Sequence, residues 1–161
     1  EGVDRRRDHV AHVEALADRI REGHWQLALD EFAEAAPQSP IADRYADIDA
    51  VFGDGTVVDA VERLSGDHGF DEEWATTTRA ALGAASPTSL WATAELLHRG
   101  AESTLSECFA RELEVAVRIT AVPDFAEGVR AVLVDKDRNP SWRPRGVGEV
   151  DPALIAGLFR D

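Results

Sequence analysis

The chain has 161 residues, of which 44% are hydrophobic and 30% are charged, so it is long enough for one domain with a hydrophobic core. Its formal net charge is −14, from 31 acidic and 17 basic residues. This charge argues against a nucleic-acid duplex as partner, because phosphate binding needs a basic face. It favours a solvated surface and a cytoplasmic location. No apolar run approaches the roughly 20 residues that span a bilayer, so we expect no membrane partner.

Two features of residue usage limit the chemistry further. Cys108 is the only cysteine, so neither an internal disulfide nor a thiolate metal cluster can form within the chain. The sequence starts at Glu1 and contains no methionine. We therefore expect a fragment, a processed chain or an excised domain.

Apolar residues recur at helical spacing along almost the whole chain and predict a succession of helices. The first two stripes are separated by Gly23, and Pro37 and Pro40 break the chain after them. A short helix is expected over residues 48–52, ending at a turn over residues 53–55. The first stripe comprises Val10, Val13, Leu16 and Ile20, and the second comprises Trp25, Ala28, Leu29 and Phe32.

Polar residues mark the starts of the later helices. Thr56 and Asp71 are placed to cap two of them, and residues 86–88 open a third that Gly100 ends. A last short helix is expected from Asp151, because the proline that follows it loses no hydrogen bond at a helix start.

Two stretches match the capping-box pattern, in which a side chain at the helix start and another three residues later bond each other's backbone. They are Thr104 with Glu107, and Asp124 with Glu127. Residues 132–134 are the only candidate strand, and the capping pattern before them favours helix instead. The fold class predicted for residues 1–161 is therefore mostly α.

Few residues combine into a pattern with chemistry of its own. Asp135, Asp137 and Asn139 have the spacing that opens a calcium loop, but the positions that need glycine and glutamate hold other residues. We therefore predict no metal site. Histidines are scattered, and Cys108 is expected to be a small buried hydrophobic residue. Two acidic pairs are expected to be solvated helix faces: Glu72 with Glu73, and Glu112 with Glu114.

Lys136 and Arg138 are the remaining candidates. They follow directly on a predicted helix and precede Pro140 and Trp142. Such a pair of cations is suited to a phosphate, although the helix dipole also favours cations at a helix C-terminus. The sequence contains no glycine-rich phosphate loop, no nucleophile elbow and no metalloprotease helix, so we predict no catalytic residue in this chain.

Three stretches carry a resemblance to a known family: residues 86–90, residues 105–109 followed by Glu112, and the long run 123–140 followed by Trp142. In this order they resemble the C-terminal region of 3-hydroxyisobutyryl-CoA hydrolases, a branch of the crotonase (enoyl-CoA hydratase/isomerase) superfamily. The likeness covers about residues 45–159, and residues 1–36 are expected to be the preceding lead-in helices.

The resemblance implies a whole enzyme that hydrolyses a short β-hydroxyacyl-CoA thioester in valine breakdown. In that family two backbone N–H groups bind the thioester carbonyl, and a glutamate does the acid–base or nucleophilic work. Both lie in an N-terminal α/β spiral, which has no counterpart in this sequence. The chain is thus expected to be the C-terminal helical layer of a crotonase-type fold with the spiral core absent, and to be inactive alone.

The resemblance also implies a ligand contact. Related crotonases place the lysine after a C-terminal helix near the nucleotide end of CoA, and Lys136 after Asp135 matches that ending, with Arg138 behind it. Phe125 and Trp142 are candidates for the acyl or adenine region, but packing against the missing half is preferred for both. No separate cofactor is implied, because coenzyme A is part of the substrate. The implied partners are the acyl-CoA, the N-terminal core of the same protein and further copies in a homo-oligomer.

Two other interpretations stay open. One keeps the superfamily but changes the reaction to hydration or isomerisation of an enoyl-CoA, which depends on carboxylates outside this chain. The other is a non-catalytic helical interaction module. A layer built to cover a spiral should expose a large apolar surface, whereas a module should not. Trp91 departs from the family pattern, because a polar or basic residue is expected there.

Overall fold

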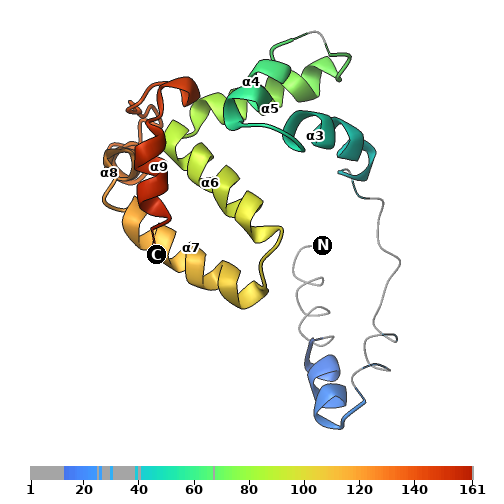
Figure 1. The fold of residues 1–161 in the computed structure, drawn as a ribbon. Coiled ribbons are helices and arrows are strands. Elements are labelled where there is room, and N and C mark those ends of the chain that lie inside the picture. The colour runs from blue at the N-terminus through green and yellow to red at the C-terminus, as the bar shows by residue number, and fades with distance from the viewer. Residues whose placement is uncertain are drawn as a thin grey trace. The chain divides into compact units, whose positions relative to one another are not determined.

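The computed structural model describes residues 13–24, 26, 30, 39, 41–66 and 68–160, and it divides at residue 43 into two compact units (Figure 1). In the first unit, residues 13–21 are helical. The chain leaves this helix at Gly23, whose φ of 83° suits glycine, so the predicted stop is confirmed. The apolar residues of the second predicted stripe, Pro37 and Pro40 lie outside the described residues.

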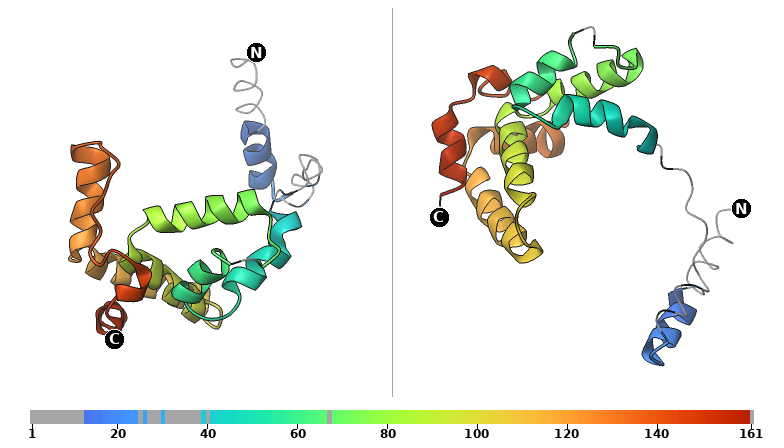
Figure 2. Two further views of the ribbon diagram at one scale, coloured as in Figure 1. Left: turned by 90° about the horizontal axis from the view of Figure 1, so that it is seen from above. Right: turned by 45° about the vertical axis from the view of Figure 1, so that its right-hand side comes forward.

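The second unit is helical throughout, and its described residues include no strand (Figures 1 and 2). This confirms the predicted mostly α class for these residues, and residues 132–134 lie in a π-helix rather than in a strand. Among the described residues, none of the helices has the length and apolar content that crossing a bilayer requires. From residue 42 onwards the elements are η1 Ala42–Arg44, α3 Tyr45–Phe52, α4 Val57–Arg63, α5 Glu72–Ala84, α6 Pro87–Gly100, α7 Leu105–Ile119, α8 Pro123–Val129, η2 Arg130–Val134, η3 Val147–Glu149 and α9 Pro152–Leu158.

The helix starts follow the capping residues closely. The hydroxyl of Thr56 accepts a hydrogen bond from the N–H of Asp59 at 3.3 Å, and the carboxylate of Asp59 accepts one from the N–H of Thr56 at 2.6 Å. The same reciprocal pair joins Thr104 and Glu107, at 3.3 and 2.8 Å. Asp71, Ser86 and Asp151 each accept a bond from a backbone N–H in the first turn of the helix they precede. These local predictions are confirmed, as is the end of α6 at Gly100.

The capping box predicted at Asp124 and Glu127 is wrong. Helix α8 starts at Pro123, so its N-cap is Val122, two residues before Asp124, and Val122 makes no side-chain hydrogen bond. Proline is well suited to the first helical position, since its φ is fixed and its missing N–H would have no partner there. Asp124 therefore lies inside the first turn, where its carboxylate is buried and bonds more distant groups.

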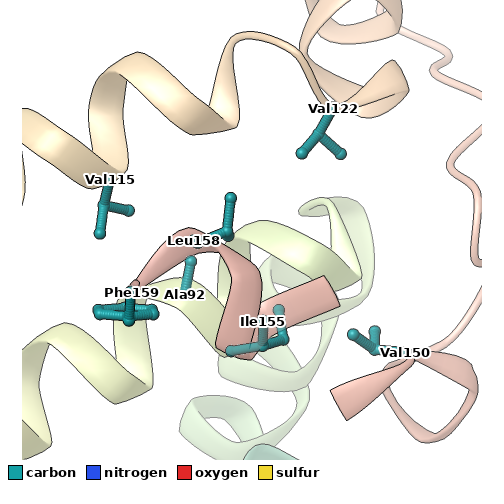
Figure 3. Packing of buried hydrophobic residues seen from close by; sticks show 7 residues of the cluster. All are labelled: Ala92, Val115, Val122, Val150, Ile155, Leu158 and Phe159. Atoms are coloured by element: carbon teal, nitrogen blue, oxygen red, sulfur yellow. The ribbon is translucent and has the colours of Figure 1, made fainter. Parts of the chain in front are cut away.

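Two apolar clusters hold the second unit together. The first joins α6, α7 and α9, and Figure 3 shows its side chains converging from these helices and from the chain segments beside them. Trp91 packs against this cluster and its Nε1 donates to the carbonyl of Val147 at 2.9 Å, so the departure from the family pattern has a structural role. The first cluster contains Ala92, Val115, Val122, Val150, Ile155, Leu158 and Phe159, and the second contains Val51, Ala60 and Leu64.

Many large apolar side chains nevertheless remain exposed. On α7 they recur every four residues and form one stripe, which we call the α7 apolar stripe. Its members are Leu105, Phe109, Leu113 and Val117, which are 71, 62, 67 and 64% exposed. Along η2, Val132, Leu133 and Val134 are 57, 66 and 69% exposed. The large exposed apolar surface expected of a covering layer is therefore present.

Candidate functional site

The candidate site is the turn that follows η2 and carries Lys136 and Arg138. The N–H of Asp135 donates to the carbonyl of Arg130 at 2.8 Å, and the N–H of Arg138 donates to that of Ala131 at 3.0 Å, so the turn is tied back onto the helix. Lys136 and Arg138 have φ values of 58° and 53°. This left-handed conformation is uncommon for residues with a Cβ, and it persists only where the surroundings impose it.

Arg130 holds the turn from within. One nitrogen of its guanidinium, Nη1, donates to Oδ2 of Asp135 at 2.6 Å and to Oδ2 of Asp137 at 2.7 Å. Its Nε and Nη2 form a bidentate pair with Glu127 at 2.9 and 2.8 Å. Nη2 also donates to the carbonyl of Asn139 at 3.2 Å. A single guanidinium thus binds three carboxylates and a backbone carbonyl, which fixes the path of the chain around it.

The electrostatics of this network favour the charged forms of Glu127, Asp137 and Arg130. Hydrogen bonds from Arg130 and from the N–H of Ser141 lower the pKa of Glu127 from 4.5 to about 2. The bond from Arg130, followed by that from the N–H of Asn139, lowers the pKa of Asp137. The carboxylates of Glu127, Asp137 and Asp135 in turn raise the pKa of Arg130. Glu127, Asp137 and Arg130 are therefore ionised at neutral pH.

Acidic and basic residues alternate along the turn, and the two kinds differ in their contacts. The carboxylates of Asp135 and Asp137 bind Arg130, whereas Lys136 and Arg138 are exposed. Within the described part of the chain, the side chain of neither residue makes a hydrogen bond or an ion pair. Lys136 is also the only lysine in the sequence. The turn thus offers two accessible cations, which suit a phosphate group, in a chain of net charge −14.

The segment after the turn is fixed at Trp142. Its Nε1 donates to the carbonyl of Ala84 at 3.0 Å, and its ring lies against Gly128, where an added Cβ would come within 3.3 Å of Cη2. Trp142 therefore packs on α5 and α8 of this chain and is half-buried there, and its packing against a missing half stays a prediction. Phe125, by contrast, is 48% exposed and remains available to another surface.

The other sequence candidates do not gather into a site. Within the described residues, no group of three or more His, Cys, Asp or Glu side chains is arranged to hold a metal ion. Cys108 is half-buried rather than buried, so that expectation is only partly met. The two acidic pairs on α5 and α7 are exposed, as predicted. His24, His68 and His98 are exposed on separate elements, and His9 and His12 lie outside the described residues.

Arg130 and Glu127 are the site residues that sequence reasoning missed. Their spacing of three residues places them on one face of a helix, which is a signal for an ion pair. The signal was hidden because Glu127 also fits a capping box, and because the two aspartates that complete the network lie beyond the end of the helix.

Comparisons with known proteins agree on one family. Residues 6–159 match the family described as Enoyl-CoA hydratase/isomerase. The mitochondrial 3-hydroxyisobutyryl-CoA hydrolase of Dictyostelium discoideum is 36% identical over 119 residues, which cover 73% of this chain and 31% of that protein. The protein of the same name from Gallus gallus is 31% identical over 148 residues, which cover 91% of this chain and 36% of that protein.

A solved structure extends the likeness to the fold. The crystal structure of a carnitinyl-CoA dehydratase from Mycobacterium thermoresistibile matches with a TM-score of 0.78 and 27% identity, covering 92% of this chain and 42% of that one. The chain thus spans roughly a third of the length of the curated relatives it matches, in their C-terminal region. It belongs to the enoyl-CoA hydratase/isomerase family and resembles the C-terminal region of its 3-hydroxyisobutyryl-CoA hydrolases.

Proposed function

We propose that this chain is the helical part of an acyl-CoA thioester hydrolase of the 3-hydroxyisobutyryl-CoA hydrolase type. In this proposal it covers the active site, and Lys136, with Arg138 behind it, binds the nucleotide end of CoA. The observation that carries the proposal is the exposed pair of cations, held in a left-handed turn while the neighbouring carboxylates are drawn onto Arg130. Because Asp135 and Asp137 are paired with Arg130, Lys136 and Arg138 are the unpaired charges of the turn to which an anionic group can bind.

The chemistry itself belongs to the rest of the enzyme in this proposal. No backbone oxyanion hole or acid–base carboxylate is assigned to this chain, and the chain alone is expected to be inactive. The α7 apolar stripe and the exposed valines and leucine of η2 support the presence of a partner surface in the same protein. The curated relatives are about three times as long as their matched part, which leaves room for that surface.

The main alternative is hydration or isomerisation of an enoyl-CoA. It is supported by the similarity to a carnitinyl-CoA dehydratase, and it assigns the same CoA-binding role to Lys136. The exposed apolar surface argues against a self-contained interaction module. The cytoplasmic location expected from the charge stays a prediction, and both curated relatives are named mitochondrial.

The test is a comparison of two reactions with the full-length protein that contains this chain. Hydrolysis of 3-hydroxyisobutyryl-CoA adds water to the thioester and releases the carboxylic acid and the free thiol of CoA, which a thiol reagent detects. Hydration of crotonyl-CoA removes the conjugated double bond and its absorbance, and releases no thiol. Thiol release without hydration supports the hydrolase, and hydration without thiol release overturns it in favour of the alternative.

A further inference from the structure

We infer that Arg130 is a positioning residue for CoA binding: it holds Asp135 and Asp137 so that Lys136 and Arg138 face the ligand. This inference rests on the proposed role of Lys136. Arg130 itself is expected to make no contact with the substrate, because its nitrogens already bind Glu127, the two aspartates and a backbone carbonyl.

The first step of the argument is conformational. The hydrogen bonds from Arg130 to Asp135 and Asp137 flank Lys136 on both sides in the sequence. Asp137 also accepts from the N–H of Asn139 at 2.9 Å, which closes the turn beyond it. Because a residue with a Cβ adopts positive φ only under such constraint, release of these bonds would let Lys136 return to ordinary backbone conformations.

The second step is electrostatic. The turn contains two carboxylates and two cations. If the aspartates were not paired with Arg130, they would repel an anionic ligand and compete with it for Lys136. Arg130 prevents this by pairing both of them on a single nitrogen. The turn can therefore present a positive face even though its own four residues, 135–138, have no net charge.

The third step concerns the shape of the guanidinium. Nε and Nη2 of Arg130 both donate to the Glu127 carboxylate, and this bidentate pairing orients Nη1 towards Asp135 and Asp137. The same Glu127 carboxylate accepts a hydrogen bond from the N–H of Ser141 at 2.6 Å, so it connects α8 to the segment that follows the turn. A lysine ammonium at this position would retain the charge, but it could not form the bidentate pair with Glu127 and reach both aspartates at the same time.

The experiment compares substrates with and without the nucleotide, using the full-length enzyme. KM is measured for the CoA thioester and for the matching pantetheine thioester, and the pantetheine KM divided by the CoA KM, which we call the nucleotide ratio, reports what the nucleotide contributes to binding. The variants are Lys136→Ala, Arg130→Lys and the double variant. Loss of one charge-assisted contact at an exposed site predicts that Lys136→Ala reduces the ratio about 3- to 10-fold. Arg130→Lys is expected to reduce it by a similar factor, and the double variant no further.

Each outcome decides a different claim. An unchanged ratio in Lys136→Ala overturns the proposed role of Lys136 and this inference with it. If Lys136→Ala reduces the ratio but Arg130→Lys does not, or if the two losses multiply, only the inference about Arg130 fails. A purely structural role for Arg130 would affect both thioesters equally and leave the ratio unchanged.

A milder variant covers the case in which Arg130→Lys does not fold. Glu127→Gln weakens the two-bond pairing that orients Arg130 and leaves Arg130 and residues 135–138 unchanged. It is expected to reduce the nucleotide ratio less than Lys136→Ala does, without a matching change for the pantetheine thioester. A wild-type ratio in a folded Glu127→Gln enzyme would count against the inference.

Discussion

Ser86 and Asp124 are 38 residues apart in the sequence, and the hydroxyl of Ser86 donates a buried hydrogen bond of 2.6 Å to Oδ2 of Asp124. The Ser86 oxygen also accepts the N–H of Ser89, in the first turn of α6. Oδ1 of Asp124 accepts the N–H of Arg143 at 2.8 Å. One buried pair therefore joins the starts of α6 and α8 to the segment that returns from the Lys136 turn.

Asp124→Ala is predicted to destabilise the full-length protein markedly. It leaves the buried hydroxyl of Ser86 and the part-buried N–H of Arg143 without their acceptor, and a buried donor left unpaired costs about 1–3 kcal/mol. Chemical denaturation measures the loss in free energy of unfolding. Glu102→Ala is the matched control, because this exposed loop carboxylate should change stability by no more than about 0.5 kcal/mol. Equal losses in the two variants would contradict the structural role of Asp124.

The pKa of Glu127 predicts how stability depends on pH. Arg130 and the N–H of Ser141 lower this pKa from 4.5 to about 2 in the folded protein, so the ionised carboxylate stabilises the fold at every pH above 4.5. That contribution is lost progressively as the pH falls from 4.5 towards 2. The Tm difference between wild type and Glu127→Gln should therefore be largest above pH 4.5 and shrink below it. A difference that stays constant from pH 7 to pH 3 would contradict the network.

Two helical glycines should respond differently to alanine. At Gly83, in α5, an added Cβ meets nothing within 4 Å, so Gly83→Ala should stabilise by about 0.5 kcal/mol through reduced backbone entropy. At Gly128, in α8, the same methyl group would lie 3.3 Å from the ring of Trp142. Gly128→Ala should therefore stabilise the protein less than Gly83→Ala does, or destabilise it, and the fluorescence of Trp142 should change. Equal gains at both positions, measured by Tm, would show that Trp142 does not pack on α8.

The helices were predictable because their signals are local. Thr56 and Thr104 cap helices through residues only three positions away, and those bonds form as the sequence pattern predicts. The candidate site was only partly predictable. Lys136 and Arg138 stand out as cations after a helix, but their left-handed backbone depends on Arg130 and on carboxylates that the sequence pattern did not assign to it.

Long-range partners account for the sequence predictions that were wrong. Asp124 resembles a capping residue, yet its partners are Ser86 and the N–H of Arg143, which lie far from it in the sequence. The contacts of Trp142 with Ala84 and Gly128 were likewise not predicted, because both residues lie in helices distant from it in the sequence. No local pattern distinguishes these outcomes, because the choice depends on which helices pack together.

Binding of the nucleotide end of CoA by Lys136 is tested most directly by substrate affinity in the full-length enzyme. KM for 3-hydroxyisobutyryl-CoA is compared between wild type, Lys136→Ala and Arg79→Ala, an exposed arginine of α5 whose removal changes the net charge by the same amount. Loss of a charge-assisted phosphate contact predicts that Lys136→Ala raises KM about 3- to 10-fold, and more than it lowers kcat. Arg79→Ala should leave both constants at the wild-type values. A KM for Lys136→Ala equal to that of Arg79→Ala would contradict the assignment of this turn to CoA binding.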